Sequence, residues 1–239
     1  MTYPDETVAK TLALADQGRS ATEVGRLLGV PRATVRDWTR GRVPRRVRPR
    51  EDLENLPPQY VHLLGLYLGD GCLSAHPRAV YKLRISLDAC YPCLIEECED
   101  AIRAVMPCSR LNRVDKGTWF EVYSYSKSWP RLFPQHGPGK KHERPIELAG
   151  WQWELVRKRP DLLLRGLLHS DGCRFINTGR GGWAHPRYSF DNRSDGIRSI
   201  FCAACDLLGL RWTASGERTI YVSRKDDVAL LDLFVGPKR

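Results

Sequence analysis

Hydrophobic and polar residues alternate along this chain with two different periods, which predict both strands and helices. In residues 81–88 every second residue is apolar, as in a strand with one buried face, and residues 187–191 repeat the pattern. Each of these segments is followed by a stretch with helical character, at 92–105 and 195–208. Further strands are expected around 118–125 and 218–223. The pattern predicts an α+β fold whose sheets each have an apolar and a polar face.

The same elements occur twice because the sequence contains a long internal repeat. Residues 63–71 read L-L-G-L-Y-L-G-D-G, and residues 164–172 read L-R-G-L-L-H-S-D-G. Asp70 and Asp171 hold the same place in the two copies, and Gly-Cys follows each of them. A repeat of this length indicates one structural unit used twice. We therefore predict two half-domains, at 59–150 and 151–239.

The two repeated motifs are expected to form helices that pack closely against each other. Small residues stand four positions apart in each copy, Gly65 and Gly69 in the first and Gly166 and Ser170 in the second. This spacing allows the backbones of two helices to approach, a geometry best known from membranes but not confined to them. These four residues are predicted to line the interface between the half-domains.

Asp70 and Asp171 are the candidate catalytic residues. Each ends its motif helix, where the helix dipole disfavours negative charge, and the glycine after it is expected to take the left-handed conformation of a helix C-cap. If the helices pack about a pseudo-two-fold axis, the two carboxylates meet and repel each other. A divalent cation with oxygen ligands relieves this repulsion, and Mg²⁺ (or Mn²⁺) is the expected metal.

The paired motifs resemble those of the LAGLIDADG (DOD-type) homing endonucleases in their single-chain, two-motif form. The resemblance covers about residues 60–239 and implies two pseudo-symmetric αββαββα half-domains, packed through the motif helices, with their sheets over the major groove of DNA. It also implies that Asp70 and Asp171 bind the metals and cut both strands. By the same resemblance the pocket lysines are Lys141, or its neighbour Lys140, and Lys238. The sixth motif position, often acidic in the family, is Leu68 in one copy and His169 in the other.

The first 41 residues predict a small all-α domain with the helix-turn-helix arrangement. Ser20 and Glu23 form a capping box at the start of one helix, Gly29 supplies a turn, and the next helix carries several arginines. The segment resembles the three-helix DNA-binding domains of resolvases. The residues left free to contact DNA are Arg32, Thr34, Arg36 and Arg40. The alternative is a helical hairpin whose arginines only face solvent.

Charge supports DNA as the partner. The formal net charge is +10, and a basic chain of this kind favours polyanions. Residues 42–58 form a predicted basic and proline-rich linker, although its middle is acidic. Further candidate DNA contacts are Arg42, Arg45 and Arg46 in this linker and Lys82, Arg84, Arg187, Arg211 and Tyr221 on the polar faces of the sheets.

Three further features of the sequence are not assigned to catalysis. The pairs Cys90–Cys93 and Cys202–Cys205 suggest zinc, but they do not fall at equivalent places in the repeat, so no zinc site is expected. His169 is expected to be a packing residue, or at most to contact the metal ligands without binding the metal itself. The glycine-rich segment 177–185 is predicted to be a hairpin.

The function predicted from the sequence is a Mg²⁺-dependent, site-specific endonuclease that cuts double-stranded DNA. We expect it to be free-standing, without intein splicing, and to act as a monomer in the bacterial cytoplasm, associated with the nucleoid when bound. No membrane or small-molecule partner is expected, since no apolar run approaches the ~18 residues of a membrane span. The alternative is a transcriptional regulator with a catalytically silent core; a third possibility is a nucleoid protein with little sequence preference.

Overall fold

The structure is a computed structural model that describes residues 3–42, 55–179, 182–236 and 238. It divides into two compact units, residues 1–50 and 51–239, which are described separately. Most of the predicted linker lies outside the described residues, and so do Arg45 and Arg46.

The first unit consists of three helices around a small apolar core. They are α1 (Asp5–Asp16), α2 (Ala21–Leu28) and α3 (Arg32–Thr39). The predicted capping box is present: the Ser20 hydroxyl accepts from the Glu23 amide at 3.3 Å, and the Glu23 carboxylate accepts from the Ser20 amide at 2.9 Å. Gly29 has a φ of +63°, so it makes the turn without strain. Val24, Val35 and Trp38 are buried and hold the helices together.

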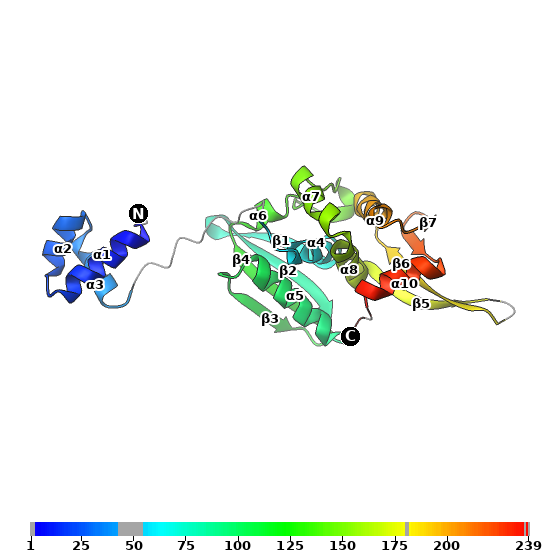
Figure 1. Cartoon of the computed structure of the whole chain (residues 1–239), viewed down its shortest axis with the longest axis horizontal. Coiled ribbons are helices and arrows are strands. Elements are labelled where there is room, and N and C mark those ends of the chain that lie inside the picture. Colours follow the sequence, from blue (N-terminus) through cyan, green and yellow to red (C-terminus); the bar gives the residue numbers. More distant parts are fainter. Residues whose placement is uncertain (1–2, 43–54, 180–181, 237, 239) are drawn as a thin grey trace. The chain divides into compact units, whose positions relative to one another are not determined.

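The second unit repeats the order helix–strand–strand–helix–strand–strand–helix (Figure 1). Its first half contains α4 (Gln59–Asp70), β1 (Gly71–His76), β2 (Val80–Asp88), α5 (Pro92–Val105), β3 (Leu111–Asp115), β4 (Trp119–Ser126) and α6 (Trp129–Leu132), and α7 (Gly150–Lys158) follows. Its second half contains α8 (Pro160–Asp171), β5 (Gly172–Thr178), β6 (Ala184–Asp191), α9 (Asp195–Leu207), β7 (Trp212–Ser215), β8 (Thr219–Val222) and α10 (Lys225–Phe234).

Each half contributes one four-stranded antiparallel sheet. The strand orders are β1-β2-β4-β3 and β5-β6-β8-β7, the same in both halves. In β2 the predicted alternation is confirmed, since Leu83, Ile85 and Leu87 are buried while the residues between them stay partly exposed. At the predicted hairpin Thr178 pairs with Ala184, while residues 180 and 181 lie outside the described residues. Helices pack on the apolar face of each sheet, α4 and α5 on the first sheet and α8 and α10 on the second, and residues of the opposite, open face alternate with the buried ones along β2 and β6.

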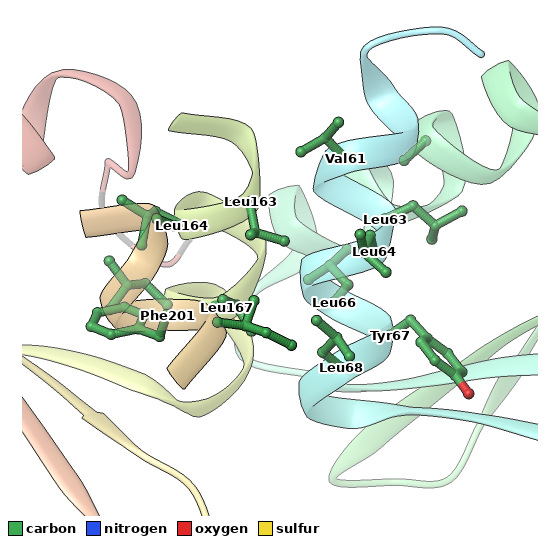
Figure 2. Close-up of a cluster of buried hydrophobic side chains, with 14 of the residues drawn as sticks. Val61, Leu63, Leu64, Leu66, Tyr67, Leu68, Leu163, Leu164, Leu167 and Phe201 are labelled. Carbon is green, nitrogen blue, oxygen red and sulfur yellow. The ribbon is translucent and has the colours of Figure 1, made fainter. Parts of the chain in front are cut away.

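The two motif helices α4 and α8 pack side by side at the centre of the second unit (Figure 1). A Cβ added to Gly65 would lie 2.6 Å from the Leu163 carbonyl oxygen, so only glycine allows this approach. Figure 2 shows Leu167 on α8 pointing toward α4, while Leu164 lies beside Phe201 of α9 on the other side. Among the described residues no helix is long and apolar enough to cross a membrane.

The glycines that follow the two aspartates differ from the prediction. Gly71 and Gly172 have φ angles of −90° and −103°, which is extended backbone and not the left-handed region. Each helix therefore passes directly into a strand without a turn. Glycine is required for a steric reason instead: a Cβ on Gly71 would lie 2.4 Å from the Tyr67 Cα, and one on Gly172 would lie 2.6 Å from the Leu168 Cα.

Candidate active site at the ends of the motif helices

Asp70 and Asp171 lie at the adjacent C-terminal ends of α4 and α8. The two ends are in contact, since a Cβ on Gly69 would lie 3.0 Å from an Asp171 carboxylate oxygen and 2.0 Å from the Ser170 hydroxyl. Asp70 opens to solvent on one side, and Asp171 is half-buried. Loss of surrounding water, and next the charge of Asp171, raise the pKa of Asp70 to about 6. Loss of water also raises the pKa of Asp171.

Two lysines lie beside the aspartates, one from each half. The Lys141 ammonium donates to the carbonyls of Tyr67, Leu68 and Gly69, at 2.9 Å for the last two. The Lys238 ammonium donates to the Gly172 carbonyl at 2.6 Å and to that of Ser170 at 3.4 Å. Each lysine therefore offsets the negative end of the motif helix in its own half.

The charges of both aspartates affect the pKa values of the two lysines. Burial lowers the pKa of Lys141 to about 8, while Asp171 and Asp70 act in the opposite direction. Burial also lowers the pKa of Lys238, and Asp70 is the first of the charges that oppose it. The two lysines thus bring positive charge to a place where carboxylates and helix ends concentrate negative charge.

The two halves of the site are not equivalent. The Asn192 amide donates to an Asp171 carboxylate oxygen at 2.7 Å, and this bond lowers the pKa of Asp171 against the effect of burial. In the first half the corresponding residue after Asp88 is Ala89, which has no polar side chain. Asp171 is therefore fixed by a hydrogen bond that Asp70 cannot form. Asn192 also lines a hollow of about 230 Å³ with Lys141, Asp171 and neighbouring residues.

Asn192 was not among the residues predicted from the sequence. The one available signal is that Asn192 directly follows Phe190-Asp191, the counterpart of Leu87-Asp88 in the first copy. Comparison of the two copies does not single it out, because the equivalent residue is Ala89. Only the position of β6 beside the end of α8 shows that its amide reaches Asp171.

The candidate DNA contacts of the second unit lie on the open faces of the sheets, with one exception. Lys82 and Arg84 pair in register with Tyr125 and Tyr123 of β4, so they share a face with two aromatic side chains. Lys82 is already engaged, because its side chain is only 18% exposed and its ammonium forms an ion pair with Glu121. In the second sheet Arg187 and Tyr221 lie on the open face. Arg211 precedes β7 and binds the Asp227 carboxylate through Nε and Nη2, both at 3.0 Å, so its guanidinium is already engaged.

The candidate contacts of the first unit lie on α3 and just after it. Arg32, Arg36 and Arg40 are exposed, and Thr34 is half-buried. Arg42 is exposed and lies 3.8 Å from the Asp37 carboxylate. Two arginines on α3 and two directly after it are therefore accessible to a polyanion.

The donor set at the helix ends fits a divalent cation such as Mg²⁺. Asp70 and Asp171 come from different halves and lie at the touching ends of α4 and α8, where loss of surrounding water raises the pKa of both carboxyl groups. Carboxylate oxygens are the ligands that Mg²⁺ prefers.

Comparison with protein-family models gives no match, and comparison with curated protein sequences gives none. Solved structures do match. A variant of the homing endonuclease I-DmoI, in complex with its target DNA in the presence of Mg, is 15% identical, with a TM-score of 0.52 over 77% of this chain and 99% of that chain. I-DmoI in complex with DNA and Mn is 16% identical, with a TM-score of 0.50 over 78% and 99%. The N-terminal LAGLIDADG domain of DUF199/WhiA is 15% identical, covering 80% and 91%, with a TM-score of 0.47. At these identities the matches concern the fold, and the chain is similar in fold to the LAGLIDADG homing endonuclease I-DmoI.

Proposed function

We propose that this protein is a sequence-specific endonuclease that cuts both strands of DNA with Mg²⁺ or Mn²⁺ at Asp70 and Asp171. The observation that supports the proposal is the contact between the ends of α4 and α8, which carry these two carboxylates at equivalent places of the repeat. Two symmetric acids suit a reaction that occurs once on each strand. The structures of I-DmoI and its variant contain DNA with Mn and with Mg, which agrees with this choice of partner and metal.

The protein's own side chains have distinct roles in this proposal. Asp70 and Asp171 would hold the metal, which would supply a Lewis acid for phosphodiester hydrolysis. Lys141 and Lys238 supply positive charge beside the carboxylates, where the transition state of phosphodiester cleavage gains negative charge. Asn192 orients the Asp171 carboxylate through its hydrogen bond.

DNA recognition is assigned to two surfaces. On the open faces of the sheets, Arg84, Arg187 and Tyr221 offer cationic and aromatic groups that suit phosphates and base edges. The helices α1 to α3 act as a helix-turn-helix module in which α3 enters the major groove. Its exposed arginines would add phosphate contacts, and therefore binding energy that depends on salt.

The test is cleavage of a randomised plasmid library by the purified chain, with sequencing of the new ends. Mg²⁺ is compared with EDTA, and the variants Asp70→Asn and Asp171→Asn are compared with Asp100→Asn. Asp100 lies on α5 with a side chain that is 75% exposed, so its loss controls for the removal of a charge. We expect discrete, Mg²⁺-dependent ends with the wild type and Asp100→Asn, and none with the two site variants.

A second function is favoured by one specific feature. The Lys141 ammonium already donates to three backbone carbonyls, so all its protons are used within the protein. That arrangement suits a core that binds DNA without cutting it, as in a transcriptional regulator. Selective DNA binding with no cut in any sequence of the library would overturn the endonuclease and leave the regulator.

A further inference from the structure

A second cluster of metal-ligand side chains lies away from the aspartates, where three helices meet. His62 of α4, Glu97 of α5 and His169 of α8 each offer one ligand atom, and these atoms all lie within 4.8 Å of one another. The two histidines are only 6% and 5% exposed, and they belong to different halves of the repeat. Neither was singled out as a ligand from the sequence.

The hydrogen bonds of His169 determine which of its ring nitrogens is free. Its Nε2 lies 2.9 Å from the Val235 carbonyl oxygen, which can only accept, so Nε2 carries the proton. The other nitrogen, Nδ1, therefore has a lone pair; it is buried and has no hydrogen-bond partner. It lies 4.0 Å from a Glu97 carboxylate oxygen, another acceptor. Two acceptors that face each other without a proton between them repel.

His62 meets the same situation from the other helix. Its Nε2 is buried and has no hydrogen-bond partner, and its ring lies 6.2 Å from that of His169. Burial lowers the pKa of His62 to about 4, so the ring is neutral near pH 7 and able to act as a ligand. An unpartnered buried nitrogen is destabilising, since it has lost its hydrogen bond to water without a replacement.

The surrounding charges do not satisfy these nitrogens. Arg165 of α8 binds both oxygens of Glu97, at 3.1 and 2.6 Å, and also donates to the carbonyls of Phe234 and Val235. It thus balances the carboxylate but gives no hydrogen bond to either imidazole. Each Glu97 oxygen keeps a further lone pair for another partner.

We propose that His62, Glu97 and His169 form a Zn²⁺ site that joins the two halves of the repeat. Two imidazoles and one carboxylate are a donor set that binds zinc with a water as the fourth ligand. The bond from His169 to the Val235 carbonyl is the outer contact that usually fixes the tautomer of a zinc-bound histidine. Zn–N bonds of about 2.0–2.1 Å place tetrahedral ligand atoms roughly 3.4 Å apart, so small side-chain rotations close the site.

The ion has a route from solvent, because the Glu97 side chain is 36% exposed while both histidines are enclosed. Imidazole ligands favour Zn²⁺ strongly over Mg²⁺, which keeps this site separate in chemistry from the oxygen ligands of Asp70 and Asp171. A bound ion would connect α4 and α5 of the first half to α8 of the second. Its expected effect is on stability, and it does not depend on whether the protein cuts DNA.

The test uses the full chain stripped of metal with EDTA and then titrated with Zn²⁺ in excess Mg²⁺. We expect one tight zinc per chain, and a rise in Tm of roughly 5–10 °C when free Zn²⁺ is about 100 times its Kd. Co²⁺ serves as the spectroscopic probe. Its visible bands should appear without the strong near-ultraviolet band of a cobalt–thiolate bond.

Variants separate this site from the free thiols and from misfolding. The changes His62→Gln and Glu97→Gln should each abolish the Tm rise, whereas His76→Gln, an exposed histidine, should keep it. Glu97→Gln keeps an acceptor for Arg165 at a partly exposed place, so it tests the ligand without emptying the core. The double change Cys90→Ser/Cys93→Ser, at two exposed thiols, should also keep the Tm rise. Absence of tight zinc in the wild type, a thiolate band with Co²⁺, or zinc lost only in the cysteine variant would overturn the proposal.

Discussion

Replacing Gly65 with alanine tests the contact on which the active site depends. In the structure a Cβ at this position would lie 2.6 Å from the Leu163 carbonyl oxygen and 2.9 Å from the Gly166 Cα. Both atoms belong to the backbone of the facing helix, so neither can rotate away. The helices α4 and α8 must therefore separate or shift along each other in Gly65→Ala.

The magnitude follows from two opposing contributions. Overpacking a tight core costs about 1–3 kcal/mol, and contact with backbone on the facing helix favours the upper end. Alanine in a helix gains about 1 kcal/mol over glycine. The net loss in the free energy of unfolding is therefore about 2 kcal/mol, which lowers the Tm of a domain of this size by roughly 4–8 °C.

The assay is thermal unfolding of the wild type, Gly65→Ala and Gly150→Ala. Gly150 begins α7, and a Cβ there would meet nothing within 4 Å, so its change controls for helix propensity alone. Cleavage or DNA binding is measured on the same samples, since separated helices also move the two aspartates apart. If Gly65→Ala melts at the same temperature as Gly150→Ala, the close approach of α4 and α8 is refuted.

Three further predictions concern charge and hydrogen bonding. Because the pKa of Asp70 is raised from its ordinary 3.8 to about 6, its ionisation destabilises the fold above about pH 6, and that cost disappears as pH falls toward 4. Above pH 6, Asp70→Asn should therefore need more urea to unfold than the wild type, with a free energy of unfolding higher by about 1 kcal/mol after solvent screening, but near pH 4 it should not. An equal gain at both pH values would contradict the expected direction of the pH dependence. Asn192→Ala removes the hydrogen bond to Asp171 and should slow cutting of one strand by about 10-fold or more, so that nicked plasmid accumulates; equal slowing of both strands would show that the halves are not separable. Arg36→Ala should weaken DNA binding on all sequences and reduce the slope of log K against log salt by about 1, whereas Lys10→Ala on α1 should leave the slope unchanged.

The repeated core could be predicted from the sequence because its signals are local and occur twice. Strict alternation across 81–88 identified β2, and small residues four apart identified the faces on which the motif helices meet. The position of Lys141 near the aspartates followed from the resemblance, and the structure places its ammonium at the end of α4. The resemblance does not indicate that the Lys141 ammonium donates its hydrogen bonds to the carbonyls at the end of α4.

The remaining features depend on three-dimensional contacts that leave no pattern along the chain. Gly71 was expected to be a left-handed cap because glycine most often ends a helix in that way, but the helix continues straight into a strand and the constraint is the Tyr67 backbone. His62 and His169 stand 107 residues apart at places that are not equivalent in the repeat. Their meeting becomes visible only when α4, α5 and α8 are assembled.

The direct passage of α4 into β1 has a mechanical consequence. Asp70 and Gly71 are consecutive residues of a helix and a strand, and the same holds for Asp171 and Gly172, so no loop lets the carboxylates move independently of the sheets. A DNA duplex bound on the open faces would push on each sheet, and the aspartate at the start of that sheet would move with it. A base step that resists bending would tilt the sheet, and the same tilt would displace the carboxylate, because no flexible loop lies between them. Discrimination between DNA sequences would then follow from the rigid connection of sheet and helix, because a poor fit far from the aspartates would misplace a carboxylate oxygen.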